Sequence, residues 1–154
     1  MTLGNLLSAD TILPEMQATE RYAAIAELVS LLVRHGQIAE TDRDPVLAAL
    51  RAREETMSTG IGFGIGIPHA STDLIYEVVG AFGRSKGGVN FEALDNQPVN
   101  LIMLFLVPQG QFQKHLHTLA KIAKLLHKKE FRQALEVAPD AQAMYQIIRT
   151  ESVK

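Results

Sequence analysis

Residues 99–107, Val-Asn-Leu-Ile-Met-Leu-Phe-Leu-Val, form an almost wholly apolar run in the middle of the chain. The run is far shorter than the roughly 18 apolar residues that span a bilayer, and it is typical of a strand buried on both faces. Residues 76–85, rich in Val, Ala and Phe, indicate a second strand, and residues 89–92 indicate a short third one. The centre of the chain therefore predicts a sheet.

Helical patterns lie on both sides of this sheet region. Apolar residues recur at helical spacing over 19–36 after a threonine that can cap the helix, and an Asp-Pro pair opens a second helix over 44–56. Three more helices are expected, from near residue 111 to 128, over 130–137 and over 140–149. Helices before and after the strands predict an α/β (α+β) fold whose sheet is covered on both faces. No repeat or linker interrupts the pattern, so residues 1–154 are expected to form a single domain.

The composition narrows the classes of partner. The 154 residues include 15 Lys and Arg, 17 Asp and Glu, and no Cys. This balance provides no positive field for nucleic acid or anionic membranes, so small molecules and proteins are the expected partners. The lack of cysteine excludes disulfides, thiolate metal sites and cysteine nucleophiles. The N-terminus has no basic residue before a short apolar stretch and no run is long enough for membrane insertion, which predicts a soluble cytoplasmic protein.

Residues 60–69, Gly-Ile-Gly-Phe-Gly-Ile-Gly-Ile-Pro-His, are the best candidate for a functional site. Glycine allows the backbone to approach a ligand closely, and proline fixes the approach of the chain to His69. The run has no GK[ST] ending and no placement of GxGxxG fits it, so it is not a nucleotide-binding loop. His69 is either a nucleophile at a surface cleft or an ordinary histidine in a tight turn beside a strand.

Two more histidines lie on the helix that begins near residue 111. At about 100° per residue, they point to opposite sides. His115 falls in line with Leu119, Ile122 and Leu126 on the apolar face, whereas His117 shares the polar face with Lys114, Lys121, Lys124 and Lys128. His115 is therefore expected to point inward, either as a hydrogen-bonded core residue or as a neighbour of His69. The lysines form either an exposed helix face or a docking surface for an acidic partner.

Two imidazoles in one pocket suit metal binding or phosphoryl transfer. A metal site is not expected, because zinc normally takes three or more protein ligands and no HExxH or carboxylate–histidine cluster is present. Arg53, near the end of the second helix, offers planar donors to a phosphoryl group or is simply a solvated helix-end residue. Transfer between imidazoles requires neither nucleotide nor metal, so no cofactor is expected.

Three segments resemble a known family. The sequence GIGFGIGIPHA (60–70), with Arg-Glu-Glu (53–55) just upstream, resembles the phosphorylation-site signature of the mannitol/fructose-type enzyme IIA family of the bacterial phosphotransferase system. NFEALDNQPVNLIMLFLVP (90–108) resembles the strand-turn-strand segment that follows in that family, and HLHTLAKIAKLL (115–126) resembles its second active-site helix. The DNQPV and HLHTL sequences are most similar to the nitrogen-regulatory branch. The resemblance implies a three-layer sandwich with a mixed sheet of about five strands.

The resemblance also implies roles for the candidate residues. His69 is expected to accept phosphate from a histidine-phosphorylated carrier protein, with His115 as its pocket neighbour and Arg53 helping to hold the phosphoryl group. The phosphate then passes to a permease subunit, as in sugar transport, or its presence is the signal that a regulatory protein detects. A third alternative is a binding module of the same fold that transfers no phosphate.

The glycine run is expected to contribute to the site through its backbone. The N–H groups of Gly64, Gly66 and Ile67 are the expected phosphate-binding groups, and a backbone carbonyl bonded to one ring nitrogen of His69 would aim the other nitrogen at phosphorus. The sequence departs from the family at two positions. Phe63 stands where members usually have a small or polar residue, which bears on the choice of partner. Gly66 stands where members of the family often have alanine, and glycine at this position is expected to loosen the loop.

Overall fold

The apolar run is the central strand of the sheet, β6 (Val99–Pro108), in a computed structural model that describes residues 2–152. The other strands are β1 (Ile12–Leu13), β2 (Gly60–Gly62), β3 (Ile65–Gly66), β4 (His69–Thr72) and β5 (Val79–Val89). The strand order is β1-β5-β6-β3-β2, with β4 also paired to β6. β5 runs antiparallel to β6, whereas β3 and β4 run parallel to it. The mixed sheet confirms the predicted fold class, with six strands where about five were expected.

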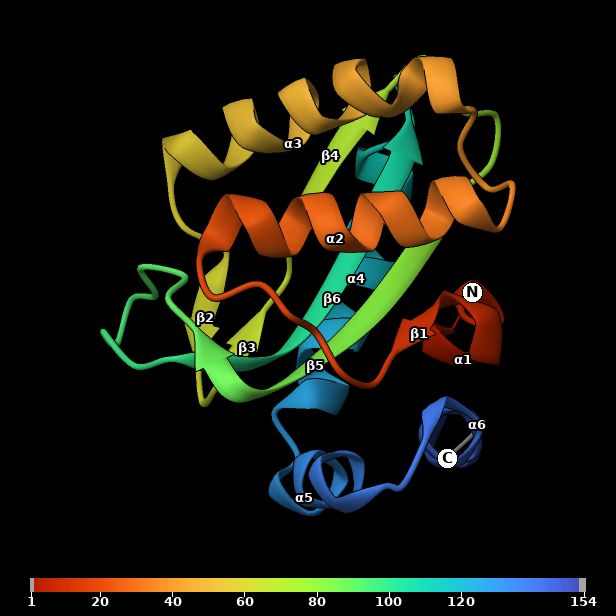
Figure 1. The fold of residues 1–154 in the computed structure, drawn as a ribbon. Helices are drawn as coiled ribbons and strands as arrows, with labels where there is room; N and C mark the ends of the chain where they lie inside the picture. The colour runs from red at the N-terminus through yellow and green to blue at the C-terminus, as the bar shows by residue number, and fades with distance from the viewer. Residues whose placement is uncertain (1, 153–154) are drawn as a thin grey trace.

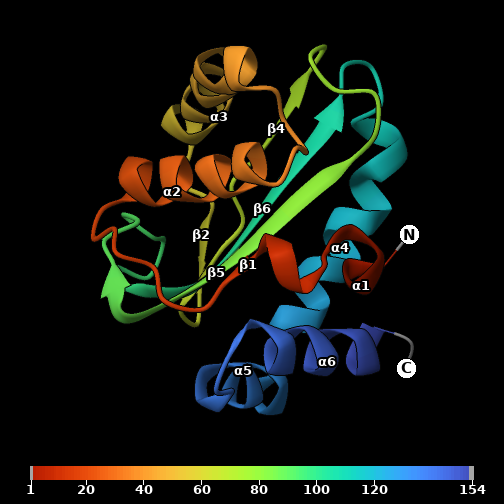
Figure 2. The same ribbon diagram turned by 45° about the vertical axis from the view of Figure 1, so that its right-hand side comes forward.

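Helices cover both faces of this sheet. The helices are α1 (Leu3–Leu6), α2 (Arg21–Arg34), α3 (Arg43–Thr56), α4 (Leu116–Leu126), α5 (Lys129–Val137) and α6 (Ala141–Ser152). Figure 1 shows α2 and α3 on one face, and Figure 2 shows α1, α4, α5 and α6 on the other side. Within residues 2–152, no helix has the length and apolar character needed to cross a bilayer.

The alternation of side chains on β6 explains why its sequence is apolar at every position from 101 to 107. Successive residues of a strand point to opposite faces, so a strand between two helical layers is apolar at every position. Ile102, Leu104 and Leu106 pack in the core beneath α2 and α3, while Leu101, Met103, Phe105 and Val107 pack in the core on the side of α4, α5 and α6. A functional residue paired with β6 therefore faces one helical layer or the other according to its register.

Pro68 interrupts what would otherwise be one continuous strand paired with β6. β3 pairs with Leu101 and Ile102, and β4 resumes the same parallel pairing at Phe105. Proline has no N–H to donate, so the break falls where it stands. The Pro68 carbonyl still accepts from the Phe105 N–H at 3.0 Å, while the Ile67 N–H turns to the Thr59 carbonyl at 3.0 Å. The glycine run, for which a tight turn beside a strand was one of two alternatives from sequence, forms two short strands joined by a two-residue turn and leads into a third.

Several element boundaries differ from the sequence predictions. Glu20, not Thr19, caps α2, because its carboxylate accepts from the Ala23 N–H at 2.6 Å and from the Tyr22 N–H at 3.2 Å. α3 begins at Arg43, one residue before the expected Asp-Pro start. β5 begins at Val79 rather than at 76 and continues to Val89, so the separate strand predicted over 89–92 does not form.

A buried arginine ties the sheet to α5. Arg84 on β5 is 3% exposed, and its Nε donates to the Pro14 carbonyl at 3.0 Å. Its Nη1 donates to the carbonyls of Leu135 at 2.8 Å and Ala138 at 2.6 Å, with Glu136 at 3.4 Å. These acceptors lie at the C-terminal end of α5, where helix carbonyls have no partner within the helix and carry partial negative charge. The guanidinium therefore caps a helix that is distant along the chain.

Candidate functional site

His69 is held at its backbone and at its ring. It opens β4 directly after Pro68, pairs in register with Phe105 and is half-buried. Its Nδ1 lies 2.8 Å from the carbonyl oxygen of Ile67. A carbonyl can only accept, so the neutral ring carries its proton on Nδ1 and keeps the lone pair on Nε2. This is the arrangement expected from sequence for a ring that presents one nitrogen to an incoming electrophile.

Two phenylalanines connect His69 to His115. The His69 ring stacks on Phe112 with a centroid separation of 5.8 Å and an interplanar angle of 14°. Phe105, the register partner of His69, lies on the same face of the sheet and meets the His115 ring edge-on at 6.4 Å. Each histidine thus contacts one of two phenylalanine rings, and Phe105, which contacts His115, is also the register partner of His69.

The predicted orientations of the two helix histidines are confirmed. His115 is 8% exposed and His117 is exposed. The difference from the sequence prediction is local, because His115 belongs to a 3-10 turn (Gln113–His115) and stands at the N-cap position of α4 rather than inside a helix that begins near residue 111.

Arg53 lies in the last turn of α3. Its Nη1 donates to the Met57 carbonyl at 3.2 Å, and the side chain is half-buried. Its positive charge acts on His69, lowering the pKa of that ring. The hydrogen bond to Met57 is compatible with both interpretations of Arg53 from sequence, as a phosphoryl-holding residue and as a helix-end residue.

Burial makes both histidines weaker bases than usual. Desolvation lowers the pKa of His69, and Arg53 lowers it further, against the opposing effects of the Ile67 carbonyl and of Glu54. Burial also lowers the pKa of His115, and the charge of Lys114 adds to this effect. Both rings are therefore neutral at pH 7, as a nucleophilic imidazole and its neighbour require.

The proposed backbone phosphate ligands are not gathered at His69. Gly64 lies in the turn between β2 and β3, before Ile65, which pairs with Leu101, whereas His69 pairs with Phe105. The turn is therefore about 13 Å along β6 from His69, at roughly 3.3 Å per residue. The N–H of Ile67 donates to Thr59, so it is already bonded.

Gly66 does not lie in a loop. It is a buried residue of β3, and a Cβ there would meet Phe91 and Val99 at 3.3 Å. The expectation that glycine loosens a loop at this position is corrected, since the residue is paired with β6 and packed on both sides.

Sequence reasoning missed Glu54 and Phe112. Glu54 is a buried carboxylate on α3, adjacent to Arg53, and Phe112 provides the ring that stacks on His69. A signal for Glu54 exists in the spacing, because Val46, Leu50 and Glu54 recur every four residues and are the buried positions of α3. A carboxylate on an apolar stripe indicates a specific buried partner. Within residues 2–152, no group of three or more His, Asp or Glu side chains is arranged to hold a metal ion.

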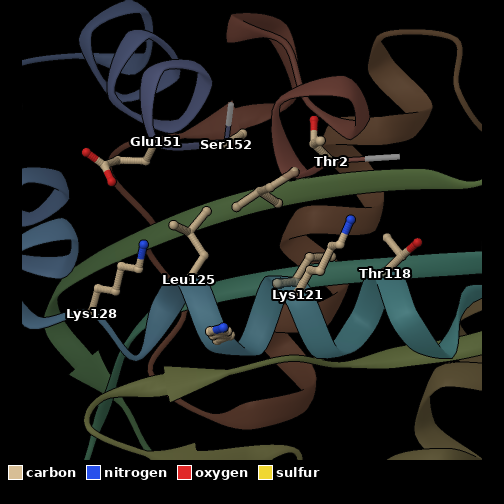
Figure 3. A pocket seen from close by; sticks show the side chains of 10 residues that line it. Thr2, Thr118, Lys121, Leu125, Lys128, Glu151 and Ser152 are labelled. Carbon is tan, nitrogen blue, oxygen red and sulfur yellow. The ribbon is translucent and has the colours of Figure 1, made fainter. Parts of the chain in front are cut away.

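A lysine-lined groove lies along α4. The groove has a volume of about 260 Å³ and is lined by residues of α1, α4 and α6 and by their flanks, including Thr2, Lys121, Lys124, Lys128 and Ser152. Figure 3 shows Lys121 on α4 and Lys128, just before α5, reaching toward the side on which Glu151 and Ser152 lie. Lys114 and His117, assigned to the same face by helical spacing, do not line it.

Phe63 occupies an unusual backbone position. It is the first central residue of the two-residue turn between β2 and β3, with φ +59°, and its side chain is 65% exposed. Positive φ is disfavoured for bulky residues, and hairpin turns of this kind usually carry Asn or Gly. The ring is held against His127, at 5.4 Å between centroids, and under the guanidinium of Arg132 at 5.3 Å.

The family is established by a family model described as "Phosphoenolpyruvate-dependent sugar phosphotransferase system, EIIA 2", which matches residues 5–151. The chain belongs to this family, and it is a phosphocarrier of the phosphotransferase system.

Proteins named for nitrogen regulation and proteins named for sugar transport are both similar to this chain. A nitrogen regulatory protein of Bradyrhizobium diazoefficiens is 31% identical over 96% of this chain and 95% of its own length. A fructose-specific EIIABC component of Bacillus subtilis is 37% identical over 96% of this chain, which spans only 23% of that relative. The crystal structure of the nitrogen regulatory protein IIA-Ntr of Neisseria meningitidis superposes with a TM-score of 0.85 at 32% identity, covering 95% of this chain and 98% of that one. The resemblance noted in the sequence is confirmed.

Proposed function

We propose that Nε2 of His69 accepts the phosphoryl group from a histidine-phosphorylated carrier protein. The observation that carries the proposal is the hydrogen bond from Nδ1 to the Ile67 carbonyl, which leaves Nε2 as the nucleophilic nitrogen. The N–P bond to the donor histidine breaks as the bond from Nε2 to phosphorus forms, and the donor ring leaves with the electron pair. The Ile67 carbonyl stabilises the positive charge that develops on the His69 ring.

Arg53 and His115 have supporting roles in this proposal. The transition state spreads negative charge over three phosphoryl oxygens, and a nearby guanidinium stabilises it. Arg53 is the cation whose charge already acts on His69. His115 supports the site through the ring of Phe105, the register partner of His69. The bonded N–H of Ile67 and the distant Gly64 make no phosphate contact in this mechanism.

Phosphorylation in vitro tests the acceptor assignment. Incubation with phosphoenolpyruvate and the two general phosphotransferase proteins should give an acid-labile, base-stable adduct, and ³¹P NMR should place it on Nε2. The His69→Ala variant should not be labelled, whereas His117→Ala, which changes an exposed histidine, should be labelled as the parent is. Labelling of His69→Ala at the parent level contradicts the assignment. An unlabelled parent favours the binding-module alternative.

The downstream role that we propose is nitrogen-type regulation, in which the phosphorylation state of His69 is the signal. The nitrogen regulatory relative and the IIA-Ntr structure support it, since each aligns over nearly its whole length. The docking face of the regulated partner would combine Phe63 with the lysine-lined groove. A phosphoryl group adds about −1.5 to −2 charge, which changes the field over such a positively edged surface.

Sugar transport is the second candidate function, and the 37% identity to the fructose-specific component favours it. In that case the phosphate passes from His69 to a permease subunit of the same system. The test is transfer from phosphorylated protein to a purified IIB domain of the host and on to sugar. Rapid transfer supports transport. No transfer, together with a regulatory partner whose affinity changes on phosphorylation, supports regulation. Either role places the chain in the cytoplasm with its carrier-protein donor.

A further inference from the structure

Glu54 is a buried carboxylate that the phosphoryl-transfer step does not use. It lies on α3 next to Arg53 and is 1% exposed. An acidic group so close to a site for a doubly charged phosphoryl group opposes binding by repulsion, and its burial is costly unless hydrogen bonds compensate. Since Glu54 is unfavourable both for phosphate binding and for burial, a specific contact must account for its position.

That contact is with Thr59, which Glu54 holds at two atoms. One carboxylate oxygen accepts from the Thr59 N–H at 2.8 Å, and the other accepts from the Thr59 hydroxyl at 2.7 Å. The guanidinium of Arg21 lies 3.8 Å away and makes a closer ion pair, at 2.8 Å, with Glu92. Thr59 is itself 4% exposed. The two bonds therefore fix both the backbone and the side chain of the residue that precedes β2.

Thr59 passes this constraint to the catalytic ring. Its carbonyl accepts from the Ile67 N–H at 3.0 Å, and the Ile67 carbonyl accepts from Nδ1 of His69 at 2.8 Å. Glu54, Thr59, Ile67 and His69 thus form one continuous series of hydrogen bonds. Ile67 lies between the last pair of β3 with β6, at Gly66, and the first pair of β4, at His69, so its N–H bond to Thr59 helps to fix its orientation.

We propose that Glu54 is a positioning residue for phosphoryl transfer, which acts through Thr59 and Ile67 to hold the His69 ring in the Nδ1–H tautomer with Nε2 facing the donor. The expected effect on the phosphorylation rate rests on the proposed function, in which His69 is the phosphoacceptor. The expected effect on the tautomer of His69 does not. Transfer between imidazoles depends on alignment, and a displacement of about 1 Å lowers such rates by on the order of 100-fold.

Four substitutions separate geometry from charge. Glu54→Gln keeps the length of the side chain, accepts from the Thr59 N–H and donates to its hydroxyl, but has no charge. Glu54→Asp keeps the charge and is shorter by one C–C bond, about 1.5 Å, so it does not reach both atoms. Glu54→Leu continues the apolar stripe of α3 and makes neither bond, which provides a variant with a packed side chain if the aspartate variant does not fold. Glu55→Gln is the matched control, since Glu55 is exposed and forms a surface ion pair with Arg51.

The first measurement is the tautomer of His69, from the ¹⁵N shifts of its ring at a pH where it is neutral. We expect a single Nδ1–H tautomer in the parent, Glu54→Gln and Glu55→Gln, and a mixture of tautomers in Glu54→Asp and Glu54→Leu. This result does not depend on phosphorylation, so it can fail or succeed separately from the proposed function.

The second measurement is single-turnover phosphorylation over a range of concentrations of the phosphorylated carrier protein. In Glu54→Asp and Glu54→Leu, the rate at saturation should fall roughly 10- to 100-fold, with little change in the half-saturating concentration because Glu54 is buried. A purely structural role would lower the melting temperature without changing the tautomer or the rate of the folded protein, and that result overturns the proposal. Loss of rate in Glu54→Gln with retention in Glu54→Asp also overturns it, because charge would then be the cause.

Discussion

Replacement of Arg84 by methionine removes a buried charge that four backbone carbonyls share. The substitution keeps an unbranched side chain on β5 but removes the donors to Pro14, Leu135 and Ala138, with distances of 3.0, 2.8 and 2.6 Å, and the longer one to Glu136. These carbonyls then lie without a donor at a site where the arginine is 3% exposed. The end of α5 loses its cap as a result.

The size of the effect follows from two opposing terms. Hydrogen bonds to charged groups contribute about 1.5–3 kcal/mol each, while methionine no longer requires a guanidinium to be buried. Each buried carbonyl left without a donor costs about 1–3 kcal/mol, and the relief of guanidinium burial offsets part of this sum, so we expect a net loss of about 4 kcal/mol. For a chain of this size, about 2–4 °C of melting temperature corresponds to 1 kcal/mol, so a loss of about 4 kcal/mol lowers the melting temperature by roughly 8–16 °C.

Urea and thermal unfolding followed by circular dichroism measure the loss. Lys86→Met is the matched control, because Lys86 is on the same strand, its side chain is 67% exposed and it lies 3.7 Å from Glu15. That variant should stay within about 0.5 kcal/mol of the parent. Arg84 pairs in register with Leu101, whereas His69 pairs with Phe105 toward the other end of β6. Phosphorylation of the folded Arg84→Met variant should therefore be unchanged. If the free energy of unfolding of Arg84→Met lies within about 1 kcal/mol of that of the parent, this account of the cap is refuted.

Three further predictions concern the site. Because the pKa of His69 is lowered from 6.5, its phosphorylation rate should stay level as pH falls through that value and decline only below the lowered pKa, in stopped-flow measurements across about pH 5 to 8. The unfolded chain then binds the proton first, so the free energy of unfolding should fall as pH drops below about 6.5, and less steeply in a His69→Gln variant. His115→Ala should slow phosphorylation by on the order of tenfold in the same assay, and His117→Ala should not; equal, negligible effects would contradict the role given to the buried histidine. Phe63→Asn should leave phosphorylation unchanged and raise stability by up to about 1 kcal/mol, because asparagine tolerates positive φ and the lost cation–π contact offsets only part of the gain; a clear loss in urea unfolding would show that the ring contacts outweigh the strain.

Local patterns in the sequence are enough to determine β6, the layers and the inward direction of His115. A strand between two helical layers has to be apolar at each position, and residues 99–107 show this without any knowledge of their partners. Helical spacing places His115 and His117 on opposite sides because 3.6 residues make a turn. The presentation of His69 is also local, since Pro68 precedes it and the Nδ1 acceptor is only two residues away.

The tertiary structure alone decided what the glycine run becomes and what supports it. Glycine has low strand propensity and no side chain to form a pattern, so the strands β2 and β3 exist because β6, more than thirty residues later, pairs with β3. β1 likewise consists of two residues that pair with β5 about seventy positions further on. The spacing of α3 indicates that Glu54 is buried, but only the folded structure shows that Thr59 provides two donors for its carboxylate. Contacts between residues distant in the chain leave no periodic signal in either segment, and for that reason only the folded structure reveals them.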